Sequence, residues 1–382
     1  MTALASQAAA GERLLSAKRL VVKIGSALLV DEESGAIRRD WLDALGDDVA
    51  ECRRRGQEVL IVTSGAIAVG RRHLGLDSGK LRLEEKQAAA ATGQIQLAHA
   101  YQETLARHRI TVAQILLTLG DTEERRRHLN ARSTIAALLR LDTVPVINEN
   151  DTVATSEIRF GDNDRLAARV AAMISADALI LLSDIDGLYS ADPRRDAKAR
   201  FIPEIREISS EIESMAGEAP PGYSSGGMVT KLAAARIAVG AGCRMAIANG
   251  RRLNPLKAIA EGAPCSWFLP AANPLTARKR WIAGSLKPVG ALTVDAGALK
   301  ALMGGRSLLP AGVASVEGEF ERGDAVRVLS PDGREVARGL SAYSAADARR
   351  IMRHKSGEIE ALLGYRGRDE MIHRDDLVLT QT

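Results

Sequence analysis

Two lysines beside glycine-rich turns are the first candidate functional residues of this chain. Lys23 lies near the end of the apolar run Leu20–Ile24, just before Gly25, and Lys231 follows the glycine pair of segment 224–230 at the start of a predicted helix. A lysine in a buried strand is costly unless its charge is used, and a helix N-terminus disfavours a cation. For Lys23, a charge that is used and an ammonium group that snorkels to water are equally good interpretations. For Lys231, a phosphate partner explains the position better, with a solvated lysine on a flexible turn as the alternative.

Two clusters of acidic and amide side chains form a second chemical feature. Residues 148–151 read Asn-Glu-Asn-Asp and residues 161–164 read Gly-Asp-Asn-Asp. The first cluster ends a predicted strand and the second opens a predicted helix, so Asp162 or Asn163 could serve as a helix cap. One cap does not explain both clusters. Carboxylates and amides that converge on one sheet edge suit an ammonium-bearing substrate, or the orientation of nearby lysines.

Two further turns follow apolar runs. Thr63-Ser64-Gly65-Ala66 precedes an apolar helix, and residues 183–189 (SDIDGLY) follow the run ALILLS. A glycine lets the backbone approach a ligand closely, and a helix N-terminus favours an anion. Taken alone, a helix cap formed by Ser64 is the simpler interpretation of the first turn.

Common catalytic signatures are absent from the sequence. It contains no G-x-x-x-x-G-K-[ST], G-x-G-x-x-G, H-E-x-x-H, C-x-x-C or G-x-S-x-G motif, and its 6 histidines are scattered. These absences argue against a zinc enzyme or a triad hydrolase. The sequence also indicates no dedicated metal ligands.

The elements that must position these residues alternate between short apolar runs and helical patterns. The runs are rich in Val, Ile and Leu, as is typical of buried parallel strands. They are Leu20–Ile24, Val59–Thr63, Val112–Thr118, Val144–Asn148, Ala178–Ser183 and Met245–Ala248. This alternation predicts an α/β sandwich, in which ligands bind at the carboxyl ends of the strands.

The pattern changes after residue 265. We predict a first domain over residues 1–265, a linker over 266–289 and a small β-rich domain over 290–382. The last segment has short alternating runs, and Pro331-Asp332-Gly333 predicts a hairpin turn. The predicted fold is an α/β sandwich followed by this small domain.

Composition indicates a reducing compartment and little affinity for nucleic acid. The chain has 3 cysteines, a net charge of +4 and 3% aromatic residues. Unpaired thiols, no apparent signal peptide and no apolar run of membrane-spanning length indicate a cytoplasmic protein. Residues 287–382 carry equal numbers of basic and acidic side chains, which argues against RNA binding. A local basic face remains an alternative to a solvated helix face there; it would comprise Arg349, Arg350, Arg353 and Lys355.

The ordered set of motifs resembles the glutamate 5-kinase (gamma-glutamyl kinase) family of the amino acid kinase superfamily, in its bacterial form with a C-terminal PUA domain. The resemblance runs from about residue 18 to the end of the chain. In the first domain it rests on Lys23-x-Gly-Ser, VTSGAIAVG (62–70), VINEND (146–151), FGDND (160–164), SDIDGLYSADPR (183–194) and SGGMVTK (225–231). Downstream it rests on RKRWI (278–282), SLLPAGV (307–313) and HRDDLV (373–378).

The resemblance implies a three-layer amino acid kinase fold and phosphorylation of the L-glutamate side-chain carboxylate by ATP. It implies that Lys23 and Lys231 neutralise the transferring phosphoryl group and that Asp164 holds them in place. Four polar residues would bind glutamate or lie close to it: Ser64, Asp151, Asn163 and Asp162. The expected ATP contacts are Lys23, Ser183, Asp184, Ser225, Gly226, Gly227, Met228, Val229, Thr230 and Lys231.

The resemblance also implies Mg²⁺ as a cofactor, L-proline as a feedback inhibitor, a homo-oligomer, and functional coupling to a glutamyl phosphate reductase. Two other functions remain open from the sequence. One is a sibling kinase that phosphorylates another acceptor. The other is an RNA-binding or RNA-modification protein that acts through the PUA-like segment.

Overall fold

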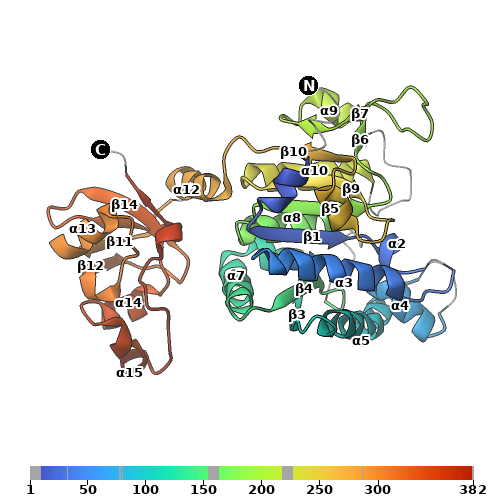
Figure 1. Cartoon of the computed structure of the whole chain (residues 1–382). Coiled ribbons are helices and arrows are strands. Elements are labelled where there is room, and N and C mark those ends of the chain that lie inside the picture. Colours follow the sequence, from blue (N-terminus) through green and yellow to red (C-terminus); the bar gives the residue numbers. More distant parts are fainter. Residues whose placement is uncertain are drawn as a thin grey trace. The chain divides into compact units, whose positions relative to one another are not determined.

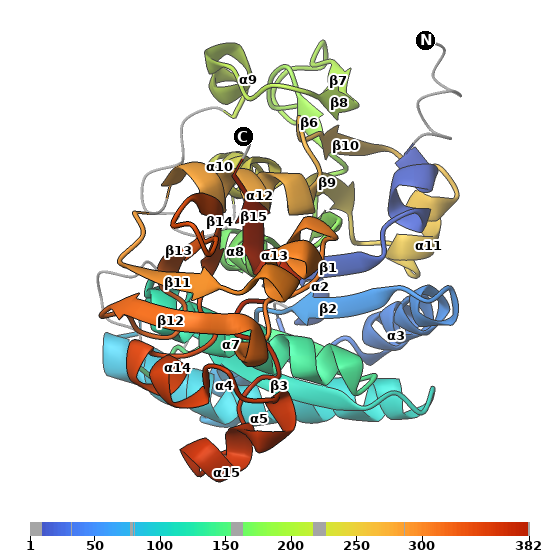
Figure 2. The same ribbon diagram turned by 90° about the vertical axis from the view of Figure 1, so that its left-hand side faces the viewer.

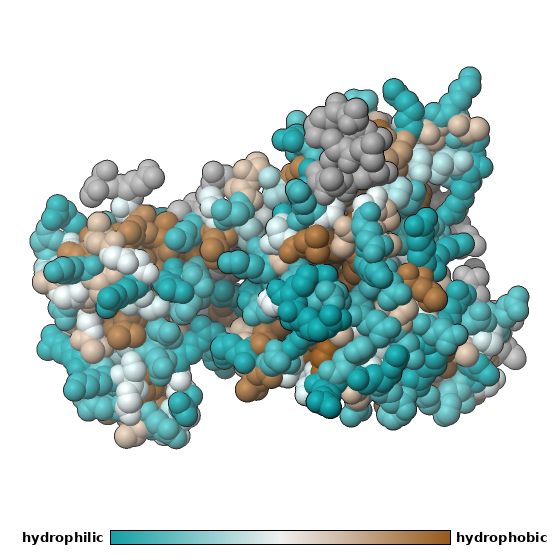
Figure 3. All heavy atoms as spheres, viewed as in Figure 1, coloured by the Kyte–Doolittle hydropathy of each residue, from teal (hydrophilic) through white to brown (hydrophobic). Residues whose placement is uncertain are grey.

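The computed structural model describes residues 10–31, 33–76, 79, 81–153, 163–216, 227–285 and 287–380. The chain divides into two compact units, Met1–Pro274 and Leu275–Thr382 (Figure 1). No helix among the described residues is both long enough and apolar enough to span a membrane. On the face drawn in Figure 3, hydrophilic side chains predominate and hydrophobic ones form separate patches.

A large sheet organises the first unit. Within the described residues it has eight strands in the order β3-β4-β2-β1-β5-β9-β10-β8. Their bounds are β1 Arg19–Ile24, β2 Glu58–Val62, β3 Val112–Leu117, β4 Val144–Glu149, β5 Ala178–Ser183, β8 Glu204–Ile205, β9 Arg244–Asn249 and β10 Cys265–Phe268. The strands from β3 to β9 are parallel, and β10 runs antiparallel to β9. All six predicted strands of this unit are confirmed.

Helices cover both faces of the sheet, because alternate side chains of each strand point to opposite sides. On β1, Val22 packs with α3 and α5, whereas Val21 packs with α8 and α10. The helices are α2 Ser26–Leu29, α3 Arg39–Arg54, α4 Ala66–His73, α5 Leu83–Ala106, α6 Leu119–Glu123, α7 Arg125–Arg140, α8 Asn163–Met173, α9 Ser210–Ser214, α10 Met228–Gly240 and α11 Pro255–Ala260. The predicted three-layer α/β/α sandwich is confirmed.

The edge of the sheet contains strands that the sequence patterns did not predict. The predicted linker, residues 266–289, begins inside β10, where Trp267 and Phe268 are fully buried. A separate pair, β6 Leu188–Tyr189 and β7 Phe201–Ile202, lies after β5. These strands have two to four residues, too few to show an alternating pattern. The division between the units falls at Pro274 and Leu275.

The second unit has its own sheet in the order β12-β11-β13-β14-β15. Its strands are β11 Gly290–Val294, β12 Val313–Gly318, β13 Ala325–Leu329, β14 Glu335–Leu340 and β15 Leu377–Leu379. Its helices are α12 Pro274–Ser285, α13 Ala296–Met303, α14 Ala345–Ile351 and α15 Ile359–Leu363. β13 and β14 are antiparallel and flank the predicted turn at residues 331–333, which confirms the hairpin. This unit has a separate hydrophobic core.

Two glycines allow α4 and α5 to pack closely, side by side in both views (Figures 1 and 2). A Cβ atom on Gly70 would lie 1.8 Å from the carbonyl oxygen of Ala89, and one on Gly93 would lie 1.9 Å from that of Ala66. Backbone atoms cannot yield at such distances. Because α4 begins right after Ser64 and Gly65, this crossing also fixes the turn at the end of β2.

We expect Gly70→Ala to destabilise the first unit by at least about 1–3 kcal/mol, the usual cost of overpacking. Gly240→Ala is the matched control, because Gly240 also lies in a helix and a Cβ there meets nothing within 4 Å. Urea unfolding of both variants measures the difference. Equal stability of Gly70→Ala and the wild type would show that the two helices can separate without cost.

Candidate active site

The carboxyl ends of β2, β1 and β5 lie next to one another at the centre of the sheet. Lys23 on β1 is in register with Val62 on β2 and Leu181 on β5. β2, the next strand in the sequence, lies on one side of β1, and β5 lies on its other side. Such a reversal of strand order opens a crevice at the carboxyl edge, where open α/β sheets bind ligands.

A buried carboxylate joins the two lysines at this edge. The Nζ atom of Lys23 lies 2.6 Å from Oδ1 of Asp164, and Nζ of Lys231 lies 3.2 Å from Oδ2. The three residues are 6%, 5% and 1% exposed for Lys23, Lys231 and Asp164 respectively. Lys23 is two residues from Val21 and shares its face of the sheet, the face covered by α8 and α10. Asp164 is on α8 and Lys231 is on α10, so the fold brings all three together.

The charges of the lysines control the ionisation of Asp164. Burial by itself would raise the pKa of this carboxyl, but Lys23 and Lys231 outweigh burial and lower the pKa to about 2. Thr230 donates a further hydrogen bond of 3.1 Å from Oγ1 to Oδ2. Asp164 therefore stays ionised at neutral pH. Two ammonium groups and one carboxylate leave this group of three residues with one net positive charge.

An amide network fixes the residue next to Asp164. Nδ2 of Asn163 lies 2.6 Å from the carbonyl oxygen of Thr63, 2.9 Å from Oγ of Ser64 and 2.9 Å from Oδ1 of Asn148. Ser64 therefore joins the site, and the interpretation of Ser64 as a helix cap is wrong. The N-cap of α4 is Gly65, which has a left-handed φ of 102° and makes no side-chain cap.

The network extends to a residue that sequence reasoning missed. Nδ2 of Asn148 donates 2.7 Å to Oε1 of Gln94, and both side chains are buried. Gln94 lies on α5, in an alanine-rich stretch without any motif. No pattern in the sequence could identify it, because its role depends on α5 packing beside β4. Asn148 lies in the predicted cluster 148–151, which was the available signal.

Asp151 lies just after β4 and is partly buried. It has no hydrogen-bond or ion-pair partner within the described part of the chain, and burial raises the pKa of its carboxyl to about 6. A carboxylate in such a place is costly until a cation pairs with it. A ligand ammonium group would supply that cation.

The turn after β5 carries Ser183 and Asp184. Oγ of Ser183 donates to Oδ1 of Asp184 at 3.1 Å, and Nη2 of Arg194 donates to Oδ2 at 2.8 Å. Burial would raise the pKa of Asp184, but these hydrogen bonds and the charge of Arg194 lower it. Asp184 is therefore an anion that Arg194 already neutralises.

α10 begins after Gly227, its N-cap, which is exposed and where a Cβ atom would meet none of the described residues within 4 Å. Val229 is 45% exposed, whereas Lys231 is buried. Three of the predicted site residues, Asp162, Ser225 and Gly226, lie outside the described residues. The described residues contain no group of three or more His, Cys, Asp or Glu side chains that could hold a metal ion.

Comparison with known proteins identifies the family. A model described as the amino acid kinase family matches residues 18–249, and one for the PUA domain matches residues 290–363. Among curated relatives, the glutamate 5-kinase of Paramagnetospirillum magneticum is 66% identical, covering 96% of this chain and 99% of the relative. The chain belongs to the glutamate 5-kinase family. The family members from Agrobacterium fabrum and Rhodospirillum rubrum are 62% and 63% identical, covering 96% and 94% of this chain and 94% and 96% of the relatives.

In this glutamate 5-kinase family member, arginines of the predicted basic face in the PUA unit contact their own domain. Nη2 of Arg349 donates 2.6 Å to the carbonyl of Gly318 and lies 2.9 Å from Glu319. Arg353 donates 3.0 Å to the carbonyl of Ala314, and Arg350 donates to a backbone carbonyl of α15. These contacts give the arginines a structural role within the unit.

We expect Asp164→Asn to lower the free energy of unfolding at pH 7 by about 3 kcal/mol, because it leaves two buried ammonium groups without a counter-charge. The control is Asp332→Asn, which breaks a surface pair with Arg334. Urea unfolding gives both values. Adding Lys231→Met to Asp164→Asn should recover part of the loss, and full stability of the single variant would refute the role of charge pairing.

Proposed function

We propose that this chain transfers the γ-phosphoryl group of ATP to the side-chain carboxylate of L-glutamate, giving L-glutamyl 5-phosphate and ADP, the first step of proline biosynthesis. The observation that carries the proposal is the buried pairing of Lys23 and Lys231 on opposite oxygens of Asp164. Membership of the glutamate 5-kinase family supports the choice of acceptor.

Phosphoryl transfer to a carboxylate needs charge neutralisation and in-line positioning, and it needs no general base because the acceptor is already ionised. We assign neutralisation to the ammonium groups of Lys23 and Lys231. Asp164 is a positioning residue in this scheme, because both of its oxygens are already bound by lysines. The net positive charge of the three residues complements an anionic phosphoryl group in transfer.

Glutamate binding is assigned to the region between β2, β4 and the start of α8. Asp151 would pair with the ammonium group of glutamate, which is supported by its lack of a partner among the described residues. Ser64 and Asn163 would hydrogen-bond the substrate, held in orientation by Asn148 and its bond to Gln94. Asp162 would lie close to the bound glutamate.

ATP binding is assigned to the other side of Lys23. Ser183 and Asp184 lie at the end of β5, next to β1, and segment 225–231 leads into α10. The exposed helix start at Gly227 suits a phosphate group. Mg²⁺ would arrive with the nucleotide and bind its phosphate oxygens. The donor set fits this arrangement, since Asp164 and Asp184 are each engaged by a cationic side chain.

The remaining relationships follow from the family assignment. We propose L-proline as a feedback inhibitor, a homo-oligomeric state, and coupling to a reductase that consumes the unstable acyl phosphate. We also propose a cytoplasmic location, where ATP is abundant. The three cysteines are buried free thiols, which a reducing compartment would preserve.

The decisive experiment measures ADP formation with L-glutamate, using hydroxylamine to trap the acyl phosphate as a hydroxamate. Acetylglutamate, aspartate, carbamate and UMP serve as the other acceptors. Hydroxamate that depends on both ATP and L-glutamate is the expected result. Faster turnover with one of the other acceptors would overturn the proposal.

We expect Lys231→Ala to lower kcat by about 100-fold or more, in the range that preorganised charges contribute to a transition state. Lys257→Ala is the control, because Lys257 is exposed on α11 and pairs only loosely with Glu261 at 3.9 Å. Steady-state kinetics at saturating substrates compare the two. Turnover of Lys231→Ala at the wild-type rate would remove this residue from the mechanism.

Because the pKa of Asp151 is raised, we expect glutamate binding to depend on pH. Above pH 6 its carboxyl is charged and can pair with an ammonium group, and below pH 6 it becomes neutral. We expect KM for glutamate to rise by about tenfold between pH 7 and pH 5, since one pH unit below a pKa removes nine-tenths of the charged form. Asp151→Asn should have a high KM that does not change over this range. A constant wild-type KM would contradict the role of Asp151.

A further inference from the structure

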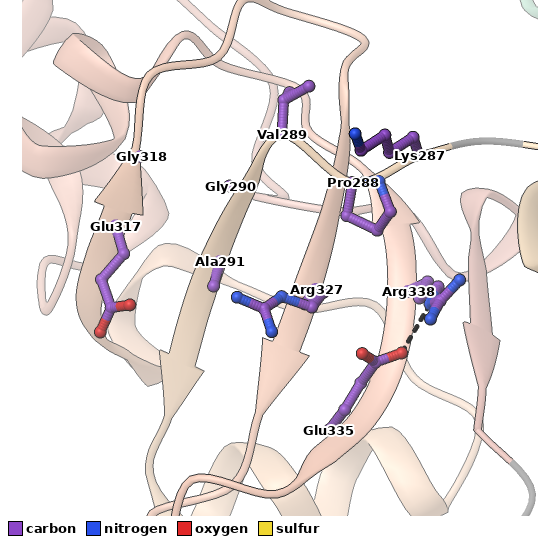
Figure 4. A pocket seen from close by; sticks show the side chains of 10 residues that line it. All are labelled: Lys287, Pro288, Val289, Gly290, Ala291, Glu317, Gly318, Arg327, Glu335 and Arg338. Atoms are coloured by element: carbon purple, nitrogen blue, oxygen red, sulfur yellow. Dashed lines mark hydrogen bonds and ion pairs between the residues drawn. The ribbon is translucent and has the colours of Figure 1, made fainter.

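A cavity of about 490 Å³ lies on the sheet of the second unit (Figure 4). Its volume is in the range of about 300–1,000 Å³ typical of small-molecule sites. The lining residues come from the segment before β11 and from four strands; they are Lys287, Pro288, Val289, Gly290, Ala291, Glu317, Gly318, Arg327, Glu335 and Arg338. The kinase site described above uses none of these residues.

The strand register sets the order of charges across the cavity. Glu317 on β12 pairs with Ala291 on β11, Ala291 pairs with Arg327 on β13, and Arg327 pairs with Arg338 on β14. Residues that pair in this way point to the same face of a sheet. Figure 4 shows the guanidinium of Arg327 extending toward Ala291, with the Glu317 carboxylate on the far side of that alanine. The small alanine side chain leaves space between two opposite charges.

The charge of Arg327 is not used within the domain. Arg327 is exposed and has no ion pair among the described residues, whereas Arg338 pairs with Glu335 at 2.6 Å. Glu317, also exposed, likewise has no ion pair in the described ranges. The cavity thus presents an unpaired cation and an unpaired anion from strands on either side of β11.

We propose that this cavity binds a free α-amino acid, with the carboxylate on Arg327 and the ammonium group on Glu317. A guanidinium binds a carboxylate through two parallel hydrogen bonds, which fixes its orientation. The lining has three cationic and two anionic side chains, so an acidic amino acid, which carries one net negative charge, balances it. The second unit is then a small-molecule-binding domain in addition to the kinase.

The order of charges across the strands also favours an amino acid over a nucleic acid as the ligand. Binding of a phosphate backbone requires several cations that can each meet a phosphate. Of the three cations in the cavity, Arg338 is paired to Glu335, and Glu317 would repel a phosphate next to Arg327, which leaves Lys287 as the one cation suited to a phosphate. A zwitterion uses both Arg327 and Glu317, whereas a polyanion uses only Arg327 of that pair.

The test is isothermal titration of the full-length chain with L-aspartate and with succinate, which is L-aspartate without its amino group. The Asp151→Asn background weakens binding at the amino-acid site assigned to the kinase unit. In that background we expect L-aspartate to bind, and Arg327→Gln to weaken it by about tenfold or more, as for a lost charge-assisted hydrogen bond. Arg306→Gln, an exposed arginine outside the cavity, is the matched control and should bind like its parent.

The amino group is tested through Glu317. The parent should bind L-aspartate more tightly than succinate, and Glu317→Gln should abolish that preference. Equal binding of L-aspartate by Arg327→Gln and its parent overturns the proposal, as does equal binding of the two ligands by the parent. Capture of a short single-stranded RNA that depends on Arg327 while L-aspartate does not bind would also overturn it. None of these outcomes depends on the kinase activity, so the two proposals fail independently.

Discussion

The structure of the kinase unit is organised around one buried carboxylate that holds two ammonium groups. Charges are expensive to remove from water, and Asp164, Lys23 and Lys231 are all nearly inaccessible to it. Each lysine has a separate oxygen of Asp164, so neither can leave without exposing an unpaired charge. The net positive charge of these three residues suits an anion that enters the crevice. Electrostatic pairing therefore both stabilises this arrangement and prepares it for a phosphoryl group.

The sheet topology makes the pairing possible. Lys23 lies on the central strand β1, on the apolar face that α8 and α10 cover. These two helices carry Asp164 and Lys231. The alternation of β1 directs Lys23 toward α8 and α10, and β1 lies between β2 and β5, where the strand order reverses. Ser64 and Ser183 thereby occupy the ends of the strands on either side. Two substrates could meet above Lys23, one from each side.

Hydrogen bonds fix the polar side chains at the carboxyl edge of the sheet. The position of the Asn163 side chain is fixed by three contacts of its amide nitrogen. They are with the backbone of Thr63, the hydroxyl of Ser64 and the amide oxygen of Asn148. Gln94 completes this network from α5, and close packing at Gly70 and Gly93 holds α5 against α4. In the second unit, by contrast with the paired charges of Asp164 and the lysines, Arg327 and Glu317 lie on either side of Ala291. Neither forms an ion pair with a described residue.

The sequence by itself determined the long apolar strands, the two-part organisation and the motif residues, because local alternation and glycine turns are visible in one dimension. The family resemblance predicted that Asp164 holds Lys23 and Lys231, but the patterns of the chain could not reveal the contact, since it joins three distant segments. Gln94, strands β8 and β10, and the contacts of Arg349 were also beyond these patterns. The contacts of Gln94 and Arg349 depend on a neighbouring residue from another element. Strands β8 and β10 are too short to show an alternating hydrophobic pattern. Only tertiary packing decides which of several polar residues meet, because burial makes an unpaired polar group costly and so selects its partner.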